Sequence, residues 1–273
     1  MRLQRGQTGA ETSVKDAPDI DRRGKVAIAL VLTTVGGFVD AVGYIALFQI
    51  FTANMSGNSV HIGMYLGQRE WLNLLRPLCA VASYVVGMML TRITIGIAGR
   101  NGIKRIASFT LAVEALLLVF FARATPAMHL GQIVDQRSPA YFAMVALLAF
   151  AMGVQTATLT HIGALTIYTT FVTGTLTKLT ESFTRLLFWA YDTLPHKGLS
   201  DIMRLAPQQK DFREGTMLVS TWIFYVLGAA VGTVTKQRWE LRALYVPVAV
   251  LAAFIVVDQF RPIDVEEEQH QTG

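Results

Sequence analysis

Six long apolar runs dominate the pattern of hydrophobic and polar positions along this chain. Each is close to the roughly 20 residues that a helix needs to cross a hydrocarbon core about 30 Å thick. Lipid offers no hydrogen-bond partners, so a chain inside it must satisfy its own backbone groups, and each run is predicted to be a helix. The runs cover about 26–48, 77–98, 105–122, 140–160, 216–235 and 243–259.

Two segments between these runs are more polar. Residues 52–67 are rich in glycine and short for a crossing, whereas residues 163–187 are rich in threonine and end in an amphipathic pattern. A full crossing, a re-entrant segment and a broken helix all remain open for each of them. Polar or irregular backbone at this depth is tolerated only where protein or a water-filled cavity covers it.

The two polar segments resemble each other, which indicates an internal repeat. Residues 52–58 and residues 169–175 share the pattern Thr-x-x-x-(Ser/Thr)-Gly-(Asn/Thr), and each follows one long apolar run and precedes two others. The chain then divides into similar halves at 26–125 and 139–260. Four crossings in each half would make the halves parallel, and three would make them inverted. Polar, glycine-interrupted segments at matching places in two halves are typical of the substrate site of a transporter.

Polar regions flank and interrupt the two halves. Residues 1–25 lack the apolar core of a cleavable signal peptide, residues 261–273 are acidic, and both are expected to be disordered tails. Residues 188–215 form a charged insert that is too polar for the membrane. Positive charges in the insert and directly before the first run, at Arg22, Arg23 and Lys25, predict that the insert and the N-terminus are cytoplasmic.

The composition supports a membrane protein and excludes other classes. Of the 273 residues, 52% are hydrophobic and only 16% are charged, whereas a soluble domain carries about a quarter charged residues. The single cysteine, Cys79, excludes a disulfide scaffold and a cysteine-rich zinc or iron–sulfur site. The net charge of +5 lies in tails and loops, where it indicates topology at a lipid bilayer and not binding of nucleic acid.

Three short boxes relate the chain to known proteins. They read Gly37-Phe38-Val39-Asp40-Ala41, Phe51-Thr52-Ala53-Asn54-Met55-Ser56-Gly57-Asn58 and Thr169-Thr170-Phe171-Val172-Thr173-Gly174-Thr175-Leu176. With them the chain resembles the YoaK-like family of bacterial multi-pass membrane proteins, a domain family of unknown function, over most of 26–260. That family tends to show Gln-Asn-Ala where this chain has Gln155-Thr156-Ala157. The resemblance implies a protein of the bacterial inner membrane and supplies no activity.

Two carboxylates lie near the middle of predicted spans. Asp40 is central in the run at 26–48, on a face of small residues, and Glu114 is central in the run at 105–122. A charge at this depth costs about 2.5–3.5 kcal/mol on insertion scales, so such groups are functional by default. We expect Asp40, with Glu114, to couple transport to protons; the structural alternative for Asp40 is a carboxylate that holds a broken helix. Arg92 is expected either to pair with Glu114 or to reach the membrane surface.

The polar segments supply candidates for a solute site. In the first, Asn54, Ser56, Asn58 and His61 offer two amides, a hydroxyl and an imidazole, and helical spacing would place both amides and the imidazole on one face. In the second half, the matching set is Gln155, Thr173 and Thr175. Such groups suit a neutral polar solute or a coordinated cation, and the alternative is hydrogen bonding that only holds the helices together.

The chain contains none of the common catalytic or cofactor-binding motifs. HExxH, GxSxG, the phosphate-binding loop GxxxxGK(S/T) and the dinucleotide-binding GxGxxG are all missing, and His61 with His161 lacks carboxylate partners at metal-binding spacing. No enzyme, cofactor or resident metal is therefore expected. The sequence predicts an all-α, polytopic helical membrane bundle that transports a small molecule or an ion. A scaffold or sensor that binds a soluble partner through 188–215 is the second hypothesis, and a channel is the third.

The sequence leaves the oligomeric state open. The pairs Gly63–Gly67 and Gly228–Gly232 match the GxxxG pattern of helix association in membranes. Packing within one chain explains this pattern as well as a homo-oligomer does, so a homo-oligomer stays one of two alternatives.

Overall fold

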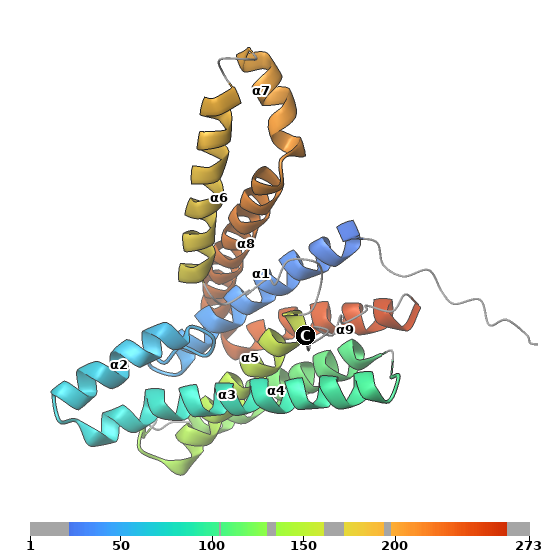
Figure 1. Ribbon diagram of the computed structural model, residues 1–273. Coiled ribbons are helices and arrows are strands. Elements are labelled where there is room, and N and C mark those ends of the chain that lie inside the picture. Colours follow the sequence, from blue (N-terminus) through green and yellow to red (C-terminus); the bar gives the residue numbers. More distant parts are fainter. Residues whose placement is uncertain (1–21, 104, 130–134, 161–171, 194–197, 261–273) are drawn as a thin grey trace, which may run out of the picture.

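The computed structural model describes residues 22–103, 105–129, 135–160, 172–193 and 198–260. Every regular element within these ranges is a helix, which confirms the all-α prediction (Figure 1). In chain order the helices are α1 (Arg22–Ala46), α2 (Met55–Gly67), α3 (Trp71–Arg100), α4 (Ile106–His129), α5 (Pro139–Leu159), α6 (Val172–Thr193), α7 (Leu199–Leu205), the 3₁₀ turn η1 (Ala206–Gln208), α8 (Lys210–Trp239), the 3₁₀ turn η2 (Glu240–Leu244) and α9 (Tyr245–Phe260).

Five stretches of described helix are long and apolar enough to cross a membrane. They are 24–46, 71–100, 106–124, 139–159 and 210–260, and the last contains both α8 and α9. All six predicted apolar runs are therefore helical. The polar segments differ from them, because α2 has only 13 residues, or roughly 20 Å at 1.5 Å per residue, and α6 is not among the five stretches.

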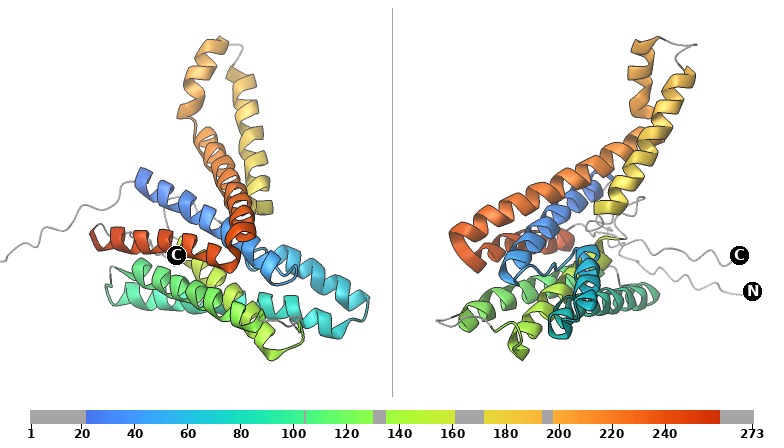
Figure 2. Two further views of the ribbon diagram at one scale, coloured as in Figure 1. Left: turned by 180° about the vertical axis from the view of Figure 1, so that it is seen from behind. Right: turned by 90° about the vertical axis from the view of Figure 1, so that its left-hand side faces the viewer.

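Two helices begin earlier than hydropathy predicts, because their polar first turns find partners. Helix α3 starts at Trp71, since Arg76 donates hydrogen bonds to Asn73 and to Gln136. Helix α8 starts at Lys210, inside the predicted insert, since its first turns pair with α6 through ionic contacts. The predicted insert at 188–215 is therefore largely helical, and with α6 it projects away from the apolar bundle (Figures 1 and 2).

Two helix pairs approach backbone to backbone, and glycine makes the approach possible. A Cβ atom at Gly37 of α1 would lie 2.1 Å from the carbonyl oxygen of Tyr225 in α8, and one at Gly153 of α5 would lie 2.3 Å from that of Tyr84 in α3. No larger residue fits either place, because real Cβ atoms do not approach an atom below 3.0 Å. Within the described residues, backbone-to-backbone packing of this kind joins α1 to α8 and α3 to α5.

Contacts along these pairs give the helix directions. Cys79 contacts Phe142 near the start of α3 and α5, and Arg92 contacts Thr160 near their ends, so these two helices are parallel. Likewise Gly228 of α8 lies against Thr34 of α1, and Gly232 lies against Phe38, so α1 and α8 are parallel as well.

Helices α4 and α9 are antiparallel, joined by Ser108–Asp258 at one end and Arg123–Tyr245 at the other. Helices α1, α4 and α8 thus run one way and α3, α5 and α9 the other (Figures 1 and 2).

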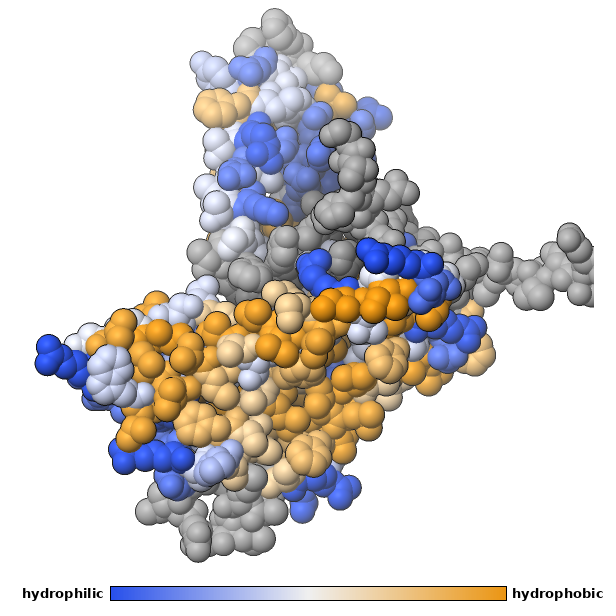
Figure 3. Space-filling view, turned by 60° about the horizontal axis from the view of Figure 1, so that its bottom comes forward, coloured by the Kyte–Doolittle hydropathy of each residue, from blue (hydrophilic) through white to orange (hydrophobic). Residues whose placement is uncertain are grey.

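The outer surface of the bundle is apolar. Large exposed side chains such as Val85 and Met89 of α3, Phe109 and Leu116 of α4, and Leu227 of α8 line it. Figure 3 shows a broad hydrophobic surface over one face of the bundle, with hydrophilic groups on the projecting part and at the ends of the bundle. Such a continuous apolar surface marks an interaction site on a soluble protein, and on this chain of long apolar helices it is the surface that faces lipid.

Candidate functional site

A polar centre lies where the chain leaves α1, and Asp40 is at its middle. One carboxylate oxygen accepts hydrogen bonds from the backbone N–H groups of Thr52 and Ala53, both at 2.8 Å, and from the Thr52 hydroxyl at 3.1 Å. The other oxygen accepts from the Tyr225 hydroxyl of α8 at 2.7 Å. Asp40 is buried, with 4% of its surface exposed. Four donors therefore balance the charge of this carboxylate.

The irregular segment 47–54 reaches Asp40 because the chain turns back beside α1. Phe48 and Gln49 adopt positive φ angles of 52° and 67°, a conformation that costs energy outside glycine. Gly43 of α1 leaves the room that the returning chain needs, since a Cβ there would lie 2.7 Å from the methyl carbon of Thr52. The result is a helix that breaks after Ala46 and resumes as α2, with Asp40 holding the break.

The two asparagines of the first polar segment shape this break. The Asn58 side chain, which is fully buried, accepts from the Phe51 N–H at 3.1 Å and donates to the Phe51 oxygen at 2.7 Å. Asn54 precedes α2 and caps it, accepting from the Gly57 N–H at 3.2 Å. The prediction of one helical face shared by Asn54, Asn58 and His61 was wrong, because α2 begins only at Met55.

The other two candidates of this segment face different surroundings. Ser56 is exposed at the start of α2. His61 is half-buried and stacks on Phe51, with 6.3 Å between ring centres, and lies 6.2 Å from the ring of Tyr65. Its buried Nδ1 atom has no hydrogen-bond partner in the described part of the chain. Of these two candidates, only His61 has a buried polar atom beside the break that could hydrogen-bond to a ligand.

Gln155 brings α5 to the same region of α1. Its fully buried amide donates to the backbone oxygen of Leu32 at 2.9 Å. The amide oxygen is buried and finds no hydrogen-bond partner among the residues that the structure describes. A Cβ on Gly36, one helical turn from Asp40, would lie 3.5 Å from that oxygen. An unsatisfied acceptor therefore lies one turn of α1 away from Asp40.

Glu114 lies elsewhere, on the buried face of α4. Its residue surface is 0% exposed, and neither carboxylate oxygen has a hydrogen-bond partner among the described residues. The alternative of an ion pair with Arg92 was wrong, since Arg92 donates to the Thr160 hydroxyl at 3.3 Å. The reason is packing: α3 packs along α5 and scarcely contacts α4. Pairing of Glu114 with Asp40 is likewise not formed, because both Asp40 oxygens accept from other donors.

The second polar segment is described only from α6 onward. Thr175 is buried at 6% exposure. The side chain of Thr173 and residues 161–171, which include His161, lie outside the described residues. The predicted counterpart of the first polar segment therefore stays a prediction.

Two residues of interest were missed in the sequence. Tyr225, the partner of Asp40, stands in Tyr225-x-x-Gly228, and Tyr84-x-x-Gly87 repeats that spacing in α3. Asp258 is fully buried near the end of α9 and accepts a hydrogen bond of 2.5 Å from the Ser108 hydroxyl of α4. The repeated Tyr-x-x-Gly spacing and an acidic residue inside the last apolar run were the available signals.

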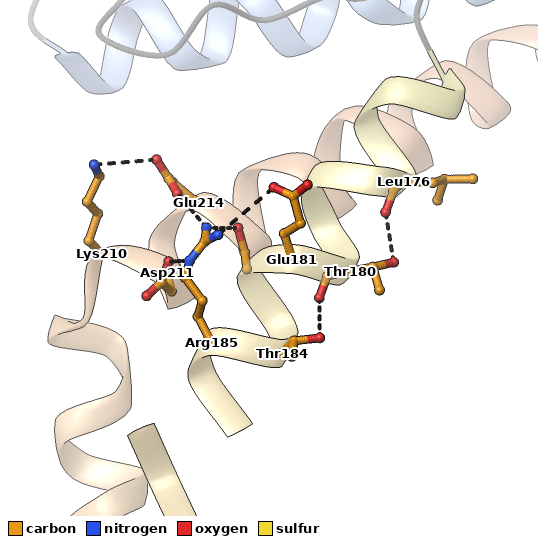
Figure 4. Close-up of polar contacts among 9 residues, drawn as sticks. Leu176, Thr180, Glu181, Thr184, Arg185, Lys210, Asp211 and Glu214 are labelled. Atoms are coloured by element: carbon orange, nitrogen blue, oxygen red, sulfur yellow. Dashed lines mark hydrogen bonds and ion pairs between the residues drawn. The ribbon is translucent and has the colours of Figure 1, made fainter. Parts of the chain in front are cut away.

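The projecting part of the chain is held by charge. Arg185 of α6 contacts Asp211 at 2.7 Å and Glu214 at 3.7 Å, both on α8, and Glu181 at 4.0 Å on its own helix (Figure 4). Lys210 contacts Glu214 at 3.9 Å. The hydrogen bond to Asp211 raises the pKa of Arg185. These contacts join α6 to the first turns of α8 outside the apolar bundle.

The GxxxG matches differ in their surroundings. Gly228 and Gly232 are used inside the chain, against the backbone of α1. At Gly63 and Gly67 on α2, a Cβ atom would meet no atom of the described residues within 4 Å. The first pair is thus explained by packing within the chain.

Apolar helices of membrane-spanning length around a buried polar break define a multi-pass helical membrane protein. More closely, the chain belongs to the family described as "Protein of unknown function (DUF1275)", which matches residues 28–257. It is also similar to the "UPF0700 transmembrane protein YoaK" of Bacillus subtilis (strain 168), with 25% identity over 237 residues that cover 85% of this chain and 92% of that protein. The expected resemblance is confirmed. No solved structure significantly matches the chain.

Proposed function

We propose that the protein is a transporter or permease for a small solute, with its site between α1, segment 47–54 and α5. One observation carries the proposal: irregular backbone lies against the buried carboxylate of Asp40, one helical turn from the Gln155 oxygen, which has no hydrogen-bond partner among the described residues. Broken helices that meet at a buried polar centre form the substrate and ion sites of many secondary transporters. A polar solute would supply the missing donor to Gln155.

We further propose that the two halves form an inverted repeat with three crossings in each half, a plan that suits this function. The close approach of Gly37 to the Tyr225 oxygen corresponds to that of Gly153 to the Tyr84 oxygen. The close approach of Gly228 to the Thr34 oxygen corresponds to that of Gly87 to the Phe150 oxygen. In such a repeat, α1 of the first half corresponds to α5 of the second, and α3 corresponds to α8.

The helix directions favour inversion over a parallel arrangement. Helix α1 is antiparallel to α5, since Gly43 lies against Leu148 and Gly36 against Met152. The repeat also relates α2 to α6, which pack on α3 and α8 respectively, and α4 to α9, which pack on each other. Inverted repeats are one of the common plans of transporter folds and place the site near the middle of the bilayer.

The same arrangement supports a cytoplasmic N-terminus in the bacterial cell membrane. The start of α1, the α3–α4 turn and the α6–α8 projection all lie on one side of the bundle by the helix directions. Positive residues are more numerous there, with Arg22, Arg23 and Lys25 before α1, Arg100 and Arg105 at the α3–α4 turn and Lys210 and Arg213 at the start of α8, than at the opposite end, which carries Arg69, Arg137, Lys236, Arg238 and Arg242 among others. The positive-inside rule assigns this side to the cytoplasm.

Labelling with a membrane-impermeant thiol reagent tests this orientation. Cys79→Ala removes the single cysteine, and new cysteines then replace Ile103 in the α3–α4 turn or Arg137 before α5. We expect Arg137→Cys to react in intact cells and Ile103→Cys only after lysis. The reverse pattern would overturn this arrangement, since it is expected from an inverted orientation or from four crossings in each half, and labelling of both in intact cells would show that α4 does not cross the membrane.

Asp40 gives the proposed transporter a route to proton coupling. A proton on the Asp40 oxygen that faces Tyr225 would reverse that hydrogen bond, so that the carboxyl group donates to the tyrosine oxygen, and it would remove the negative charge that segment 47–54 faces. Glu114 offers a second buried carboxyl group without a partner among the described residues. We propose that a change in the charge of one of these buried groups couples proton movement to transport.

A thermal-shift screen of the full-length protein in detergent tests the proposal. Small metabolites and ions are screened at two pH values. A ligand that binds the folded protein increases the free energy of unfolding by about 2.7 kcal/mol at a hundredfold excess over Kd, and so raises the unfolding temperature. A transporter predicts a stabilising ligand whose shift is lost in Asp40→Asn and Gln155→Met and kept in Val60→Ala, a change on the exposed face of α2. Absence of any ligand, or a shift unaffected by both site variants, would overturn this site.

A scaffold or sensor is the second candidate, and exposed apolar residues on the projection favour it. Phe188 and Tyr191 of α6 are 65% and 76% exposed, and Leu199 and Met203 of α7 are 65% and 71% exposed. Such side chains on a charged projection suit a soluble partner. Replacing 195–207 by a glycine–serine linker discriminates, because a transporter would keep its ligand-induced shift and a scaffold would lose partner binding.

A further inference from the structure

A cavity of about 910 Å³ lies where α8 ends and α9 begins, far along the chain from the Asp40 centre. Its polar lining comes from Arg238, Glu240 and Arg242, and its aromatic lining from Trp239 and Tyr245. Its volume is within the range of sites for small ligands. The position is the end of an apolar helix hairpin, so the cavity opens at the boundary between lipid and water.

The polar side of the cavity presents positive charge. Arg238 and Arg242 are exposed, and neither guanidinium takes part in an ion pair or side-chain hydrogen bond within the described residues. Arg123 of α4 reaches the same place, where it donates to the Tyr245 hydroxyl at 2.5 Å and lies 6.0 Å from the centre of that ring. The lining thus holds two arginines and one carboxylate, that of Glu240, and a third guanidinium contacts the Tyr245 that also lines the cavity. The balance favours an anionic ligand.

The other side of the cavity is apolar. Val246, Ala249 and Val250, on the first turns of α9, form this wall, and Val246 is 40% exposed. Trp239 is 54% exposed at the rim, and tryptophan and tyrosine gather at membrane interfaces because their rings are apolar and their N–H or O–H groups are polar. A ligand that fills the site has a charged head and an apolar tail.

We propose that this cavity binds an anionic phospholipid. The phosphate lies between Arg238 and Arg242, where guanidinium groups suit phosphate oxygens, and the acyl chain follows Val246 and Val250 into the bilayer. Inorganic phosphate carries the same charge, but it leaves the apolar wall without a partner. A lipid from the surrounding leaflet satisfies both sides. The inference is independent of the proposed transport function.

Thermal unfolding of delipidated full-length protein in detergent tests the assignment. Three additions are compared: phosphatidylglycerol, phosphatidylcholine and inorganic phosphate. We expect phosphatidylglycerol alone to raise the unfolding temperature by several degrees. In Arg238→Gln/Arg242→Gln its half-effect concentration should rise at least roughly tenfold, since each charge-assisted contact contributes about that factor to affinity.

A matched variant separates a site from general charge. Arg69→Gln/Arg137→Gln removes two arginines from the loops at the same end of the bundle and should keep the wild-type response to phosphatidylglycerol. Val246→Asp, which places a negative charge on the apolar wall, should abolish the response. Size-exclusion elution and helical circular dichroism like those of the wild type show that each variant is folded. An equal shift with phosphatidylcholine, an equal shift with inorganic phosphate, or an unchanged response in Arg238→Gln/Arg242→Gln would overturn the proposal.

Discussion

The carboxylate of Asp40 and the hydroxyl of Tyr225 meet at 2.7 Å, although 185 positions separate them in the chain. The contact joins the first membrane helix to α8 close to Gly37, where their backbones approach tightly. The same carboxylate holds the backbone of Thr52 and Ala53. One side chain therefore ties together two helices from opposite halves of the chain and the break between α1 and α2.

Asp40→Asn separates the charge of this residue from its shape. The amide oxygen can still accept from Thr52 and Ala53, and the amide nitrogen can donate to the Tyr225 oxygen, so we expect a folded protein. We expect Asp40→Leu to lose all four hydrogen bonds and leave two buried backbone N–H groups unsatisfied, at about 1–3 kcal/mol each. Thermal unfolding in detergent measures both variants. If Asp40→Asn is as unstable as Asp40→Leu, the charge itself holds the fold and a coupling role loses its support.

Tyr225→Phe removes one donor to Asp40 and keeps the ring. A hydrogen bond to a charged group contributes about 1.5–3 kcal/mol, so we expect a lower unfolding temperature by several degrees. Tyr191→Phe is the matched control, because Tyr191 is 76% exposed on α6, and it should leave the unfolding temperature unchanged. Equal behaviour of the two variants would contradict the importance of the Asp40–Tyr225 contact.

Gly228→Ala should be destabilising where Gly63→Ala is not. A Cβ at Gly228 would lie 2.1 Å from the Thr34 oxygen and must push α8 away from α1, at about 1–3 kcal/mol for an overpacked contact. A Cβ at Gly63 of α2 would touch none of the described residues, and alanine there improves helix propensity by about 0.8–1.0 kcal/mol. Thermal unfolding of the two variants side by side tests this. A loss of stability in Gly63→Ala would indicate that α2 contacts a second copy.

Glu114→Gln should be tolerated, since an ionised carboxylate without a partner is costly to bury and a neutral group of the same shape is not. We expect unfolding at neutral pH within about 1 kcal/mol of the wild type, as is usual for a substitution that conserves shape and leaves no new unsatisfied charge. If Glu114 carries a coupling proton, the variant also loses the pH dependence of ligand stabilisation. A strongly destabilised Glu114→Gln would show that the carboxylate is ionised and held by a partner.

Arg185→Gln tests the charged clamp between α6 and α8. Its three acidic neighbours lose their common partner, so the projection should open and become more sensitive to protease at 194–209. The unfolding temperature of the membrane bundle should not change, because the clamp lies outside it. Lys236→Gln, near the other end of α8, is the control and should be cut like the wild type. Equal cleavage of Arg185→Gln and wild type would show that apolar packing holds α6 on α8.

The sequence by itself determined the class of protein and the place of its polar segments. Runs of apolar residues predict membrane-spanning helices because each helix satisfies its own backbone hydrogen bonds. This property is local and does not depend on the neighbouring helices. All six predicted runs are helical. The importance of Asp40 was also predictable, since an acidic residue in the middle of such a run must find compensation. The sequence left open whether Asp40 couples transport to protons or holds a broken helix.

Only the tertiary structure decided the partners, because these depend on which helices pack together and in what register. It placed Tyr225 on Asp40 and Thr160 on Arg92, and it left Glu114 without a partner among the described residues. It also showed that Asn54 caps α2 and is not part of a helical face, since its own backbone angles are not helical. Hydropathy indicates whether each segment lies in lipid or in water. Close glycine contacts and long-range hydrogen bonds arise only once the helices are assembled.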